Sequence, residues 1–123
     1  MLKTLVLVLL ATIVGSAGHV LLAKGMRPVG DLTEAPPSRL GAMVIRAVGN
    51  PWLLLGVLLQ AAFFFAYLTL LSRADVSLVL PMTAVGYIVV ALLAQLLLAE
   101  AVTATRWAGI GFIVVGVFLV SRT

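Results

Sequence analysis

Four long apolar runs alternate with short polar seams along this chain. The runs cover residues 5–23, 52–72, 76–99 and 107–120, and almost every charged residue falls at a seam. Helices of about 20 residues, rising about 1.5 Å per residue, can cross a hydrocarbon core about 30 Å thick. The pattern therefore predicts an all-α integral membrane protein. Its four transmembrane helices are expected at about residues 2–24, 51–72, 76–99 and 104–121, within a single domain over residues 1–123.

The segment between the first two runs predicts a short interfacial helix. The proline-rich stretch 28–37 breaks the chain, and Ser38 is expected to cap an amphipathic helix at about residues 38–49. Arg39 and Arg46 share the polar face of that helix. Because the helix is too short to span a membrane, its arginines either tether the chain to lipid phosphate or capture a substrate.

Turn and breaker residues predict two antiparallel hairpins. Asn50 and Pro51 open the second transmembrane helix, and the seam 73–75 is so short that the third helix must run back beside it. Pro81 lies in the second turn of the third helix, where its ring is expected to bend or loosen the helix. The third and fourth helices form the second hairpin.

The composition excludes several classes of function. Hydrophobic residues make up 63% of the chain, charged residues make up 10%, and the mean hydropathy is +1.27. The sequence has no room for a soluble catalytic domain and carries no phosphate-binding glycine loop, metal-ligand cluster or assembled nucleophile and base. We therefore expect no enzyme, no cofactor and no metal. The net charge of +4 comes from cations that flank helices, where they meet membrane lipids and not nucleic acid.

The first apolar run is expected to stay in the protein. Lys3 and the small residues around Ser16 also fit a cleaved secretory signal. The run nevertheless continues to Ala23, which is long enough to span a membrane.

The cations divide unequally between the two ends of the predicted bundle. Because cytoplasmic segments carry the excess of Lys and Arg, we expect the termini outside and the long first loop in the cytoplasm. The split is close enough to balance that two chains of opposite orientation could also form one dimer. The two groups are Lys3, Arg73 and Arg122 at the end with the termini, and Lys24, Arg27, Arg39, Arg46 and Arg106 at the other end.

The first helix carries the most polar stripe at membrane depth. Thr12, Ser16 and His19 follow i, i+4, i+7 spacing and share a face, and Lys24 follows near the membrane edge. In one interpretation the hydroxyls bond carbonyls of their own helix, His19 is a neutral core residue and Lys24 extends to the interface. In the other, an ionisable group that costs about 2.5–3.5 kcal/mol inside a membrane lines a substrate path. His19 and Lys24 would then bind an anion.

Other polar side chains are candidates for the lining of a cavity. Gln60 and Tyr67 share a face of the second helix, and Tyr87 lies in the third. Each can equally make a hydrogen bond between helices, worth about 0.6 kcal/mol. Glu100 is expected to pair with Arg106 at a helix end. No Asp or Glu lies inside an apolar run, so the buried carboxylate that a proton-coupled exporter of organic cations needs is absent.

The second half of the chain resembles a known superfamily. The segments 74–82 (ADVSLVLPM) and 99–109 (AEAVTATRWAG) are similar to the drug/metabolite transporter superfamily, and within it to four-helix proteins of the small multidrug resistance type. The segment 109–117 (GIGFIVVGV) is similar to the dimerisation stretch of that family. There, small residues seven positions apart, here Gly109 and Gly116, let two helices approach closely.

Departures from the multidrug pattern indicate which branch of the superfamily the chain resembles. Ser16 stands where multidrug members have a glutamate, and Leu80 and Thr83 stand at the tyrosine and tryptophan positions, so the drug-export site is absent. The chain is instead similar to the small subunits proposed to flip undecaprenyl phosphate-aminoarabinose. This likeness is carried by residues 18–24, Pro81-Met82 and Glu100.

The resemblance implies a flippase for an anionic polyprenyl-phosphate lipid, with or without a sugar, in the bacterial inner membrane. Four helices hardly enclose a path, so we expect a dimer with an identical chain or a paralogue. One alternative is a small multidrug or metabolite exporter with Gln60, Tyr67 and Tyr87 as its pocket, and another is a non-transport assembly partner that docks through its last helix. The residues expected to bind substrate are Ser16, His19, Lys24, Arg39, Arg46, Gln60, Tyr67, Tyr87 and Glu100.

Overall fold

The computed structural model describes residues 2–123, which form helices and connecting loops. Four segments in this range are long and apolar enough to span a membrane, as the sequence predicts. The third of them, Val76–Leu97, is divided by a short 3₁₀ helix, η1. The elements are α1 (Leu2–Met26), α2 (Pro37–Val48), α3 (Pro51–Leu71), α4 (Val76–Met82), η1 (Thr83–Val85), α5 (Gly86–Leu97) and α6 (Ala104–Ser121).

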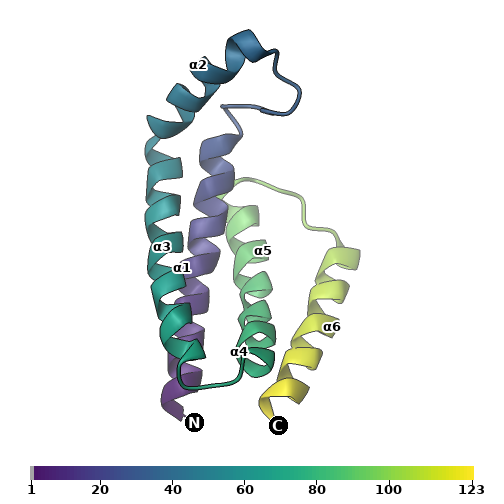
Figure 1. The fold of residues 1–123 in the computed structure, drawn as a ribbon. Coiled ribbons are helices and arrows are strands. Elements are labelled where there is room, and N and C mark those ends of the chain that lie inside the picture. The colour runs from purple at the N-terminus through teal and green to yellow at the C-terminus, as the bar shows by residue number, and fades with distance from the viewer. Residues whose placement is uncertain (1) are drawn as a thin grey trace.

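The spans lie in the order α3, α1, α5, α6 across the bundle, and both termini lie at the same end (Figure 1). α1 packs against α3 on one side and α5 on the other. The most apolar stretch of α1 is 44% buried inside the chain, whereas that of α6 is 0% buried. α1 is therefore the centre of the fold, and α6 presents its surface to lipid or to another subunit.

Glycines allow α1 and α3 to approach closely. A Cβ atom on Gly25 would stand 2.6 Å from the backbone nitrogen of Leu53, and one on Gly56 would stand 2.8 Å from that of Leu22. Small residues give such contacts in membranes because lipid removes the hydrophobic driving force between helices. Asn50 strengthens the same contact, since its Oδ1 accepts from the first N–H groups of α3 and its Nδ2 donates to the carbonyl of Gly25 at 3.1 Å.

Ser16 joins α1 to α5. Its hydroxyl donates to the carbonyl of Gly86 at 3.2 Å, and both residues are buried. The interpretation that the hydroxyls of α1 bond their own helix is therefore wrong for Ser16. Thr12 is 3% exposed, and its Oγ1 has no hydrogen-bond partner within the described part of the chain. Beside these residues lies a buried cluster of Val8, Ala11, Leu70, Val79 and Met82.

Pro81 interrupts the third span, as predicted. α4 ends at Met82, the 3₁₀ helix η1 follows, and α5 begins at Gly86. Pro81 lies in the last turn of α4, directly before this change of helix type, and its missing N–H leaves the carbonyl of Ser77 without the usual helical bond. The span ends at Leu97, before the expected residue 99. Ala99 adopts a left-handed φ of 54° and turns the chain toward α6.

α2 begins slightly earlier than expected. Its N-cap is Pro36 and Pro37 is its first residue, so Ser38 does not cap the helix as predicted. Proline is tolerated there because the first N–H groups of a helix have no partner inside it. The polar face of α2 turns toward the loop that follows α1, while Val44 and Val48 are exposed.

Candidate functional site

The end of the bundle opposite the termini gathers most of the cations (Figure 1). Two of them lie on α2, and the others lie near the end of α1 or the start of α6. This is the division that the sequence predicts. Guanidinium groups form strong hydrogen bonds to phosphate, so this end suits an anionic head group. The five cations are Lys24, Arg27, Arg39, Arg46 and Arg106.

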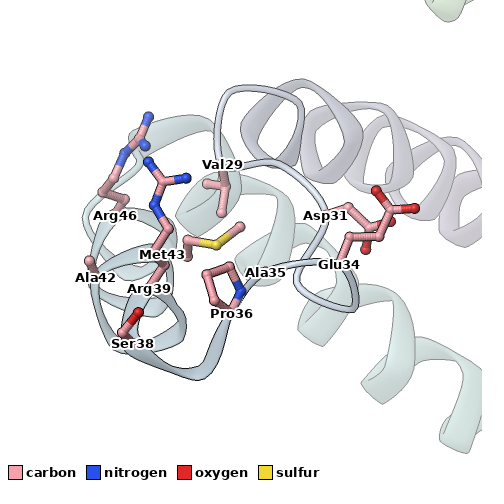
Figure 2. Close-up of a pocket in the computed structure, with 10 residues that line it drawn as sticks. All are labelled: Val29, Asp31, Glu34, Ala35, Pro36, Ser38, Arg39, Ala42, Met43 and Arg46. Atoms are coloured by element: carbon pink, nitrogen blue, oxygen red, sulfur yellow. The ribbon is translucent and has the colours of Figure 1, made fainter.

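A hollow of about 490 Å³ lies between α2 and the loop that follows α1 (Figure 2). Arg39 and Arg46 are on one side of it, and Asp31 and Glu34 are on the opposite side, with Met43 between the two pairs. We call it the α2 hollow. The two arginines that sequence analysis singled out for phosphate binding therefore share one site, and the two carboxylates are added by the fold.

The loop that carries the acidic side is fixed by local bonds. Val29 is buried, and the N–H groups of Val29 and Gly30 both donate to the carbonyl of Met26. Gly30 has a φ of 96°, which favours glycine. Oδ1 of Asp31 accepts from the hydroxyl of Thr33 at 2.6 Å and from its N–H at 2.8 Å. These bonds lower the pKa of Asp31 below its ordinary value and keep the carboxylate charged.

The basic side is connected to the same loop. Nη2 of Arg46 donates to the carbonyl of Pro28 at 3.1 Å. Arg46 therefore turns inward toward the loop, while the choice between a tether to lipid and capture of a substrate stays a prediction. Both arginines remain exposed enough to reach a bound molecule.

Glu100 pairs with Arg27, and the predicted pair with Arg106 is wrong. Arg27 also donates to the carbonyl of Leu98 at 3.5 Å. The side chains are 50% exposed for Arg27 and 33% exposed for Glu100, so solvent screens the attraction. The contact ties the end of α1 to the connection between α5 and α6.

A second hollow, of about 400 Å³, opens between α5 and α6. α6 packs on α4 and η1, and it diverges from α5 toward its own N-terminus (Figure 1). Tyr87, Glu100 and Arg106 are the polar side chains in this α5–α6 hollow. Its other lining residues are apolar: Val90, Ala91, Ala94, Val102, Gly109, Ile110 and Ile113. Such a groove can hold a hydrocarbon chain with a charged group at its mouth.

His19 and Lys24 are not brought together. His19 is exposed on α1, and Lys24 places its Nζ 4.2 Å from the centroid of the Trp52 ring. Five positions along a helix also separate two side chains by about 140° around its axis. The expected joint anion site of these two residues is thus not formed within one chain.

Three other predicted residues take part in packing or in separate surfaces. Gln60 donates from Nε2 to the carbonyl of Gly15 at 2.9 Å. Tyr67 stacks on Phe63 with ring centroids 6.0 Å apart, whereas Tyr87 is 52% exposed in the α5–α6 hollow. Gln60, Tyr67 and Tyr87 therefore do not share one pocket, contrary to the exporter alternative.

The glycines of α6 have free space around them in the single chain. A Cβ atom on Gly109 or Gly116 would meet no atom within 4 Å. This leaves room for the close approach of another helix, and their place in a dimer interface stays a prediction. Across residues 2–123, no group of three or more His, Cys, Asp or Glu side chains could hold a metal ion.

Comparison with known proteins shows which protein family the chain resembles. Residues 4–122 match the EamA-like transporter family. The "Probable 4-amino-4-deoxy-L-arabinose-phosphoundecaprenol flippase subunit ArnE" of Serratia proteamaculans is 36% identical over 78 residues, which cover 63% of this chain and 68% of the relative. Its counterpart in Pseudomonas savastanoi pv. phaseolicola is 30% identical over 79 residues, covering 64% and 69%. No solved structure matches the chain.

The chain belongs to the EamA-like transporter family, and the resemblance to the drug/metabolite transporter superfamily and its flippase subunits is confirmed. With four membrane-spanning helices, it is a multi-pass protein of the bacterial inner membrane.

Proposed function

We propose that the chain is a subunit of a flippase that moves an anionic polyprenyl-phosphate lipid across the inner membrane. The observation that carries the proposal is the pair Arg39 and Arg46, which lines one hollow at the cation-rich end of the bundle. Membership in a transporter family and likeness to flippase subunits support the same conclusion.

The arginines serve the first step of lipid flipping, in which the head group leaves bulk water. A phosphate that leaves water loses its hydrogen bonds, and an unpaired ion is very costly in an apolar medium. Charge-assisted hydrogen bonds from arginine replace those of water, and the planar guanidinium can bind a phosphate through two bonds. Arg39 and Arg46 therefore gather the head group at the membrane surface.

The hydrocarbon chain of the lipid needs no enclosed path. We place its first segment in the α5–α6 hollow, which has apolar walls and Arg106 near its mouth. The rest of the chain stays among the membrane lipids. Such a division lets a small protein carry a long polyprenyl lipid.

A second subunit completes the path in this proposal. The apolar surface of α6 is unburied, and Gly116, which lies outside the lining of the α5–α6 hollow, is open, so a second copy or a paralogue can pack there. In this proposal the assembly also covers the exposed face of α1 that carries His19, so that His19 meets the phosphate at membrane depth. Lys24 acts separately at the membrane edge, beside Trp52.

The membrane potential can drive the movement. With the cation-rich end in the cytoplasm, the lipid is gathered there and carried outward. Moving one negative charge out of a negative interior releases about 2.3 kcal/mol per 100 mV, so a proton-binding carboxylate is not required.

Transport by the complex extracted in mild detergent and reconstituted in liposomes tests the proposal. The substrate is a fluorescent polyprenyl phosphate, and the readout is its protection from a quencher outside the vesicles. We expect Arg39→Gln with Arg46→Gln to reduce the rate at least about tenfold, since each lost ionic hydrogen bond costs about 1.5–3 kcal/mol.

The matched control is Arg73→Gln with Arg122→Gln, which removes the same charge from exposed positions at the opposite end of the bundle. The control should transport at nearly the wild-type rate. Full activity of the Arg39 and Arg46 variant would refute the mechanism, and export of organic cations without lipid movement would favour the exporter alternative.

A further inference from the structure

The ion pair between Arg27 and Glu100 lies at the edge of the α5–α6 hollow. Glu100 belongs to the connection between α5 and α6, which starts beside the end of α1, and it lines the hollow together with Arg106 (Figure 1). Arg27 donates through Nη2 to the Glu100 carboxylate and through Nη1 to the carbonyl of Leu98. Because the planar donors of a guanidinium suit carboxylate and phosphate alike, Glu100 occupies a place that an anionic head group can also take.

The connection between α5 and α6 is held in a strained conformation. Ala99, between the two residues that Arg27 binds, has a left-handed φ of 54°, which is unfavourable for an L-residue. The N–H of Glu100 also donates to the carbonyl of Ala94 at 3.2 Å. Since these contacts hold the strained backbone in place, loss of those with Arg27 favours release of the connection.

A phosphate is a strong competitor for Arg27. The side chains of Arg27 and Glu100 are 50% and 33% exposed, so water screens their attraction. A phosphate monoester carries more negative charge than a carboxylate and has three strong acceptor oxygens. Arg106, in the lining that contains Glu100, adds a second cation on the side from which a lipid in the hollow would arrive.

We propose that Glu100 is an internal anion that an incoming phosphate displaces from Arg27, and that this exchange releases the connection between α5 and α6 at the mouth of the α5–α6 hollow. The inference rests on the proposed flippase function and adds a control of access to it. The ion pair holds the connection against the lipid groove, and the arriving head group opens the groove for its own hydrocarbon chain.

Cysteine labelling measures the release, since the chain has no cysteine of its own. Val102→Cys places a thiol in the connection, where Val102 is half-buried and lines the hollow. With the purified complex in phosphatidylcholine nanodiscs, farnesyl phosphate should accelerate the reaction of this thiol with a water-soluble maleimide at least about fivefold, because labelling follows the open population. Mass spectrometry assigns the label to this chain. Ala101→Cys is the control, because Ala101 is already exposed in the same connection, so its rate should change by less than about twofold.

Three probes separate the anion from the hydrocarbon chain. Farnesyl phosphate carries both, farnesol carries the chain alone, and inorganic phosphate is the anion alone. Farnesol should leave the labelling rate unchanged. Acceleration by farnesyl phosphate but not by inorganic phosphate would assign the exchange to a lipid head group, whereas acceleration by both would support the exchange and identify free phosphate as a second source of the anion.

Two variants with opposite expected effects assign the exchange to residues. Glu100→Gln removes the competing anion, so the Val102→Cys thiol should react quickly without ligand, and radiolabelled farnesyl phosphate should bind at least about threefold more tightly. Arg27→Gln removes the cation and should weaken this binding at least about threefold. Asp75→Asn is the matched control for a lost negative charge, because Asp75 is exposed at the other end of the bundle and makes no capping bond.

Unchanged labelling with farnesyl phosphate, equal acceleration by farnesol, or weaker binding by the Glu100→Gln variant overturns this inference. The proposed function is tested separately, by lipid transport in the variant of Arg39 and Arg46. It still stands if that variant loses transport while the connection does not move, so the two failures are distinguishable.

Discussion

Arg27, directly after α1, forms an ion pair with Glu100, 73 residues further along the chain. The pair joins the central helix to the connection that leads into α6. Glu100 and Arg106 both line the α5–α6 hollow, and among residues 2–123 it is Arg27 that forms the ion pair with Glu100. A contact between segments far apart in the chain thus supplies the partner of Glu100 beside the proposed lipid groove.

Loss of the Arg27 pair is expected to change stability little. Both side chains are partly exposed, so Arg27→Gln should lower the free energy of unfolding by at most about 1 kcal/mol, as is typical of solvent-screened pairs. Denaturant titration in detergent micelles measures this. The charge exchange of Arg27→Glu with Glu100→Arg should recover part of the loss, and a penalty of several kcal/mol would show that the pair is better shielded than its exposure indicates.

Gly25 is predicted to be essential for the contact between α1 and α3. A Cβ atom there would stand 2.6 Å from the backbone of Leu53, so Gly25→Ala should destabilise the fold by about 1–3 kcal/mol through overpacking. A Cβ atom on Gly41, in α2, would meet no atom within 4 Å, and Gly41→Ala should be neutral or stabilise by about 0.5–1 kcal/mol. Equal effects of the two changes in the same unfolding assay would argue against the close approach.

The contact between Ser16 and Gly86 predicts an interaction energy between two helices. Ser16→Ala should cost about 0.6 kcal/mol, the average for a hydrogen bond between membrane helices. Gly86→Ala should cost more, because its Cβ atom would lie 2.6 Å from Oγ of Ser16. A double-mutant cycle with Ser16→Gly should show that removing the hydroxyl relieves part of the Gly86→Ala penalty. Strict additivity of the two changes would contradict this contact.

The open glycines of α6 predict where a second subunit packs. Gly116→Leu should change the unfolding free energy of the single chain by no more than about 1 kcal/mol, the difference in helix propensity, since nothing lies within 4 Å of a Cβ atom at this position. Fluorescence energy transfer between labelled chains in bilayers should nevertheless decrease. Gly111→Leu is the control, because Gly111 is equally open but on another side of the helix. Loss of association in the Gly111 variant alone would place the interface elsewhere.

Ala99 is predicted to carry backbone strain. Its φ of 54° is left-handed, which costs an L-residue about 1–2 kcal/mol relative to glycine. After the larger entropy of glycine in the unfolded chain is subtracted, Ala99→Gly should stabilise the protein by about 0.5–1 kcal/mol. Ala101→Gly relieves no left-handed backbone strain, so it should destabilise the protein by about 0.4–1 kcal/mol. Thermal unfolding in detergent compares the two, and stabilisation by both changes would point to an unrelated cause.

Much of the fold follows directly from the order of residue types. The four spans are set by the length of the apolar runs, Pro81 marks where the third span changes helix type, and Asn50 with Pro51 starts α3. The gathering of cations at one end also follows, because alternate seams of an antiparallel bundle lie at the same end. These features depend on local chemistry and on the thickness of the membrane, and both can be read from a single sequence.

The site was only partly predictable. Arg39 and Arg46 were recognised because they share a face of an amphipathic helix, but Asp31 and Glu34 were missed. The Asp-x-Thr spacing from Asp31 to Thr33 signals a fixed turn, yet it does not tell which helix the turn will face.

The membrane-spanning segments and the charges at each end of the bundle follow from the order of residues alone, because burial of the backbone in lipid allows few other solutions. The packing of the helices, in contrast, sets the bond from Ser16 to Gly86, the different directions of His19 and Lys24, and the set of charged residues that line the α2 hollow. These outcomes depend on the rotation and close packing of whole helices and on the path of a loop. Such choices are made by contacts between residues far apart in the chain.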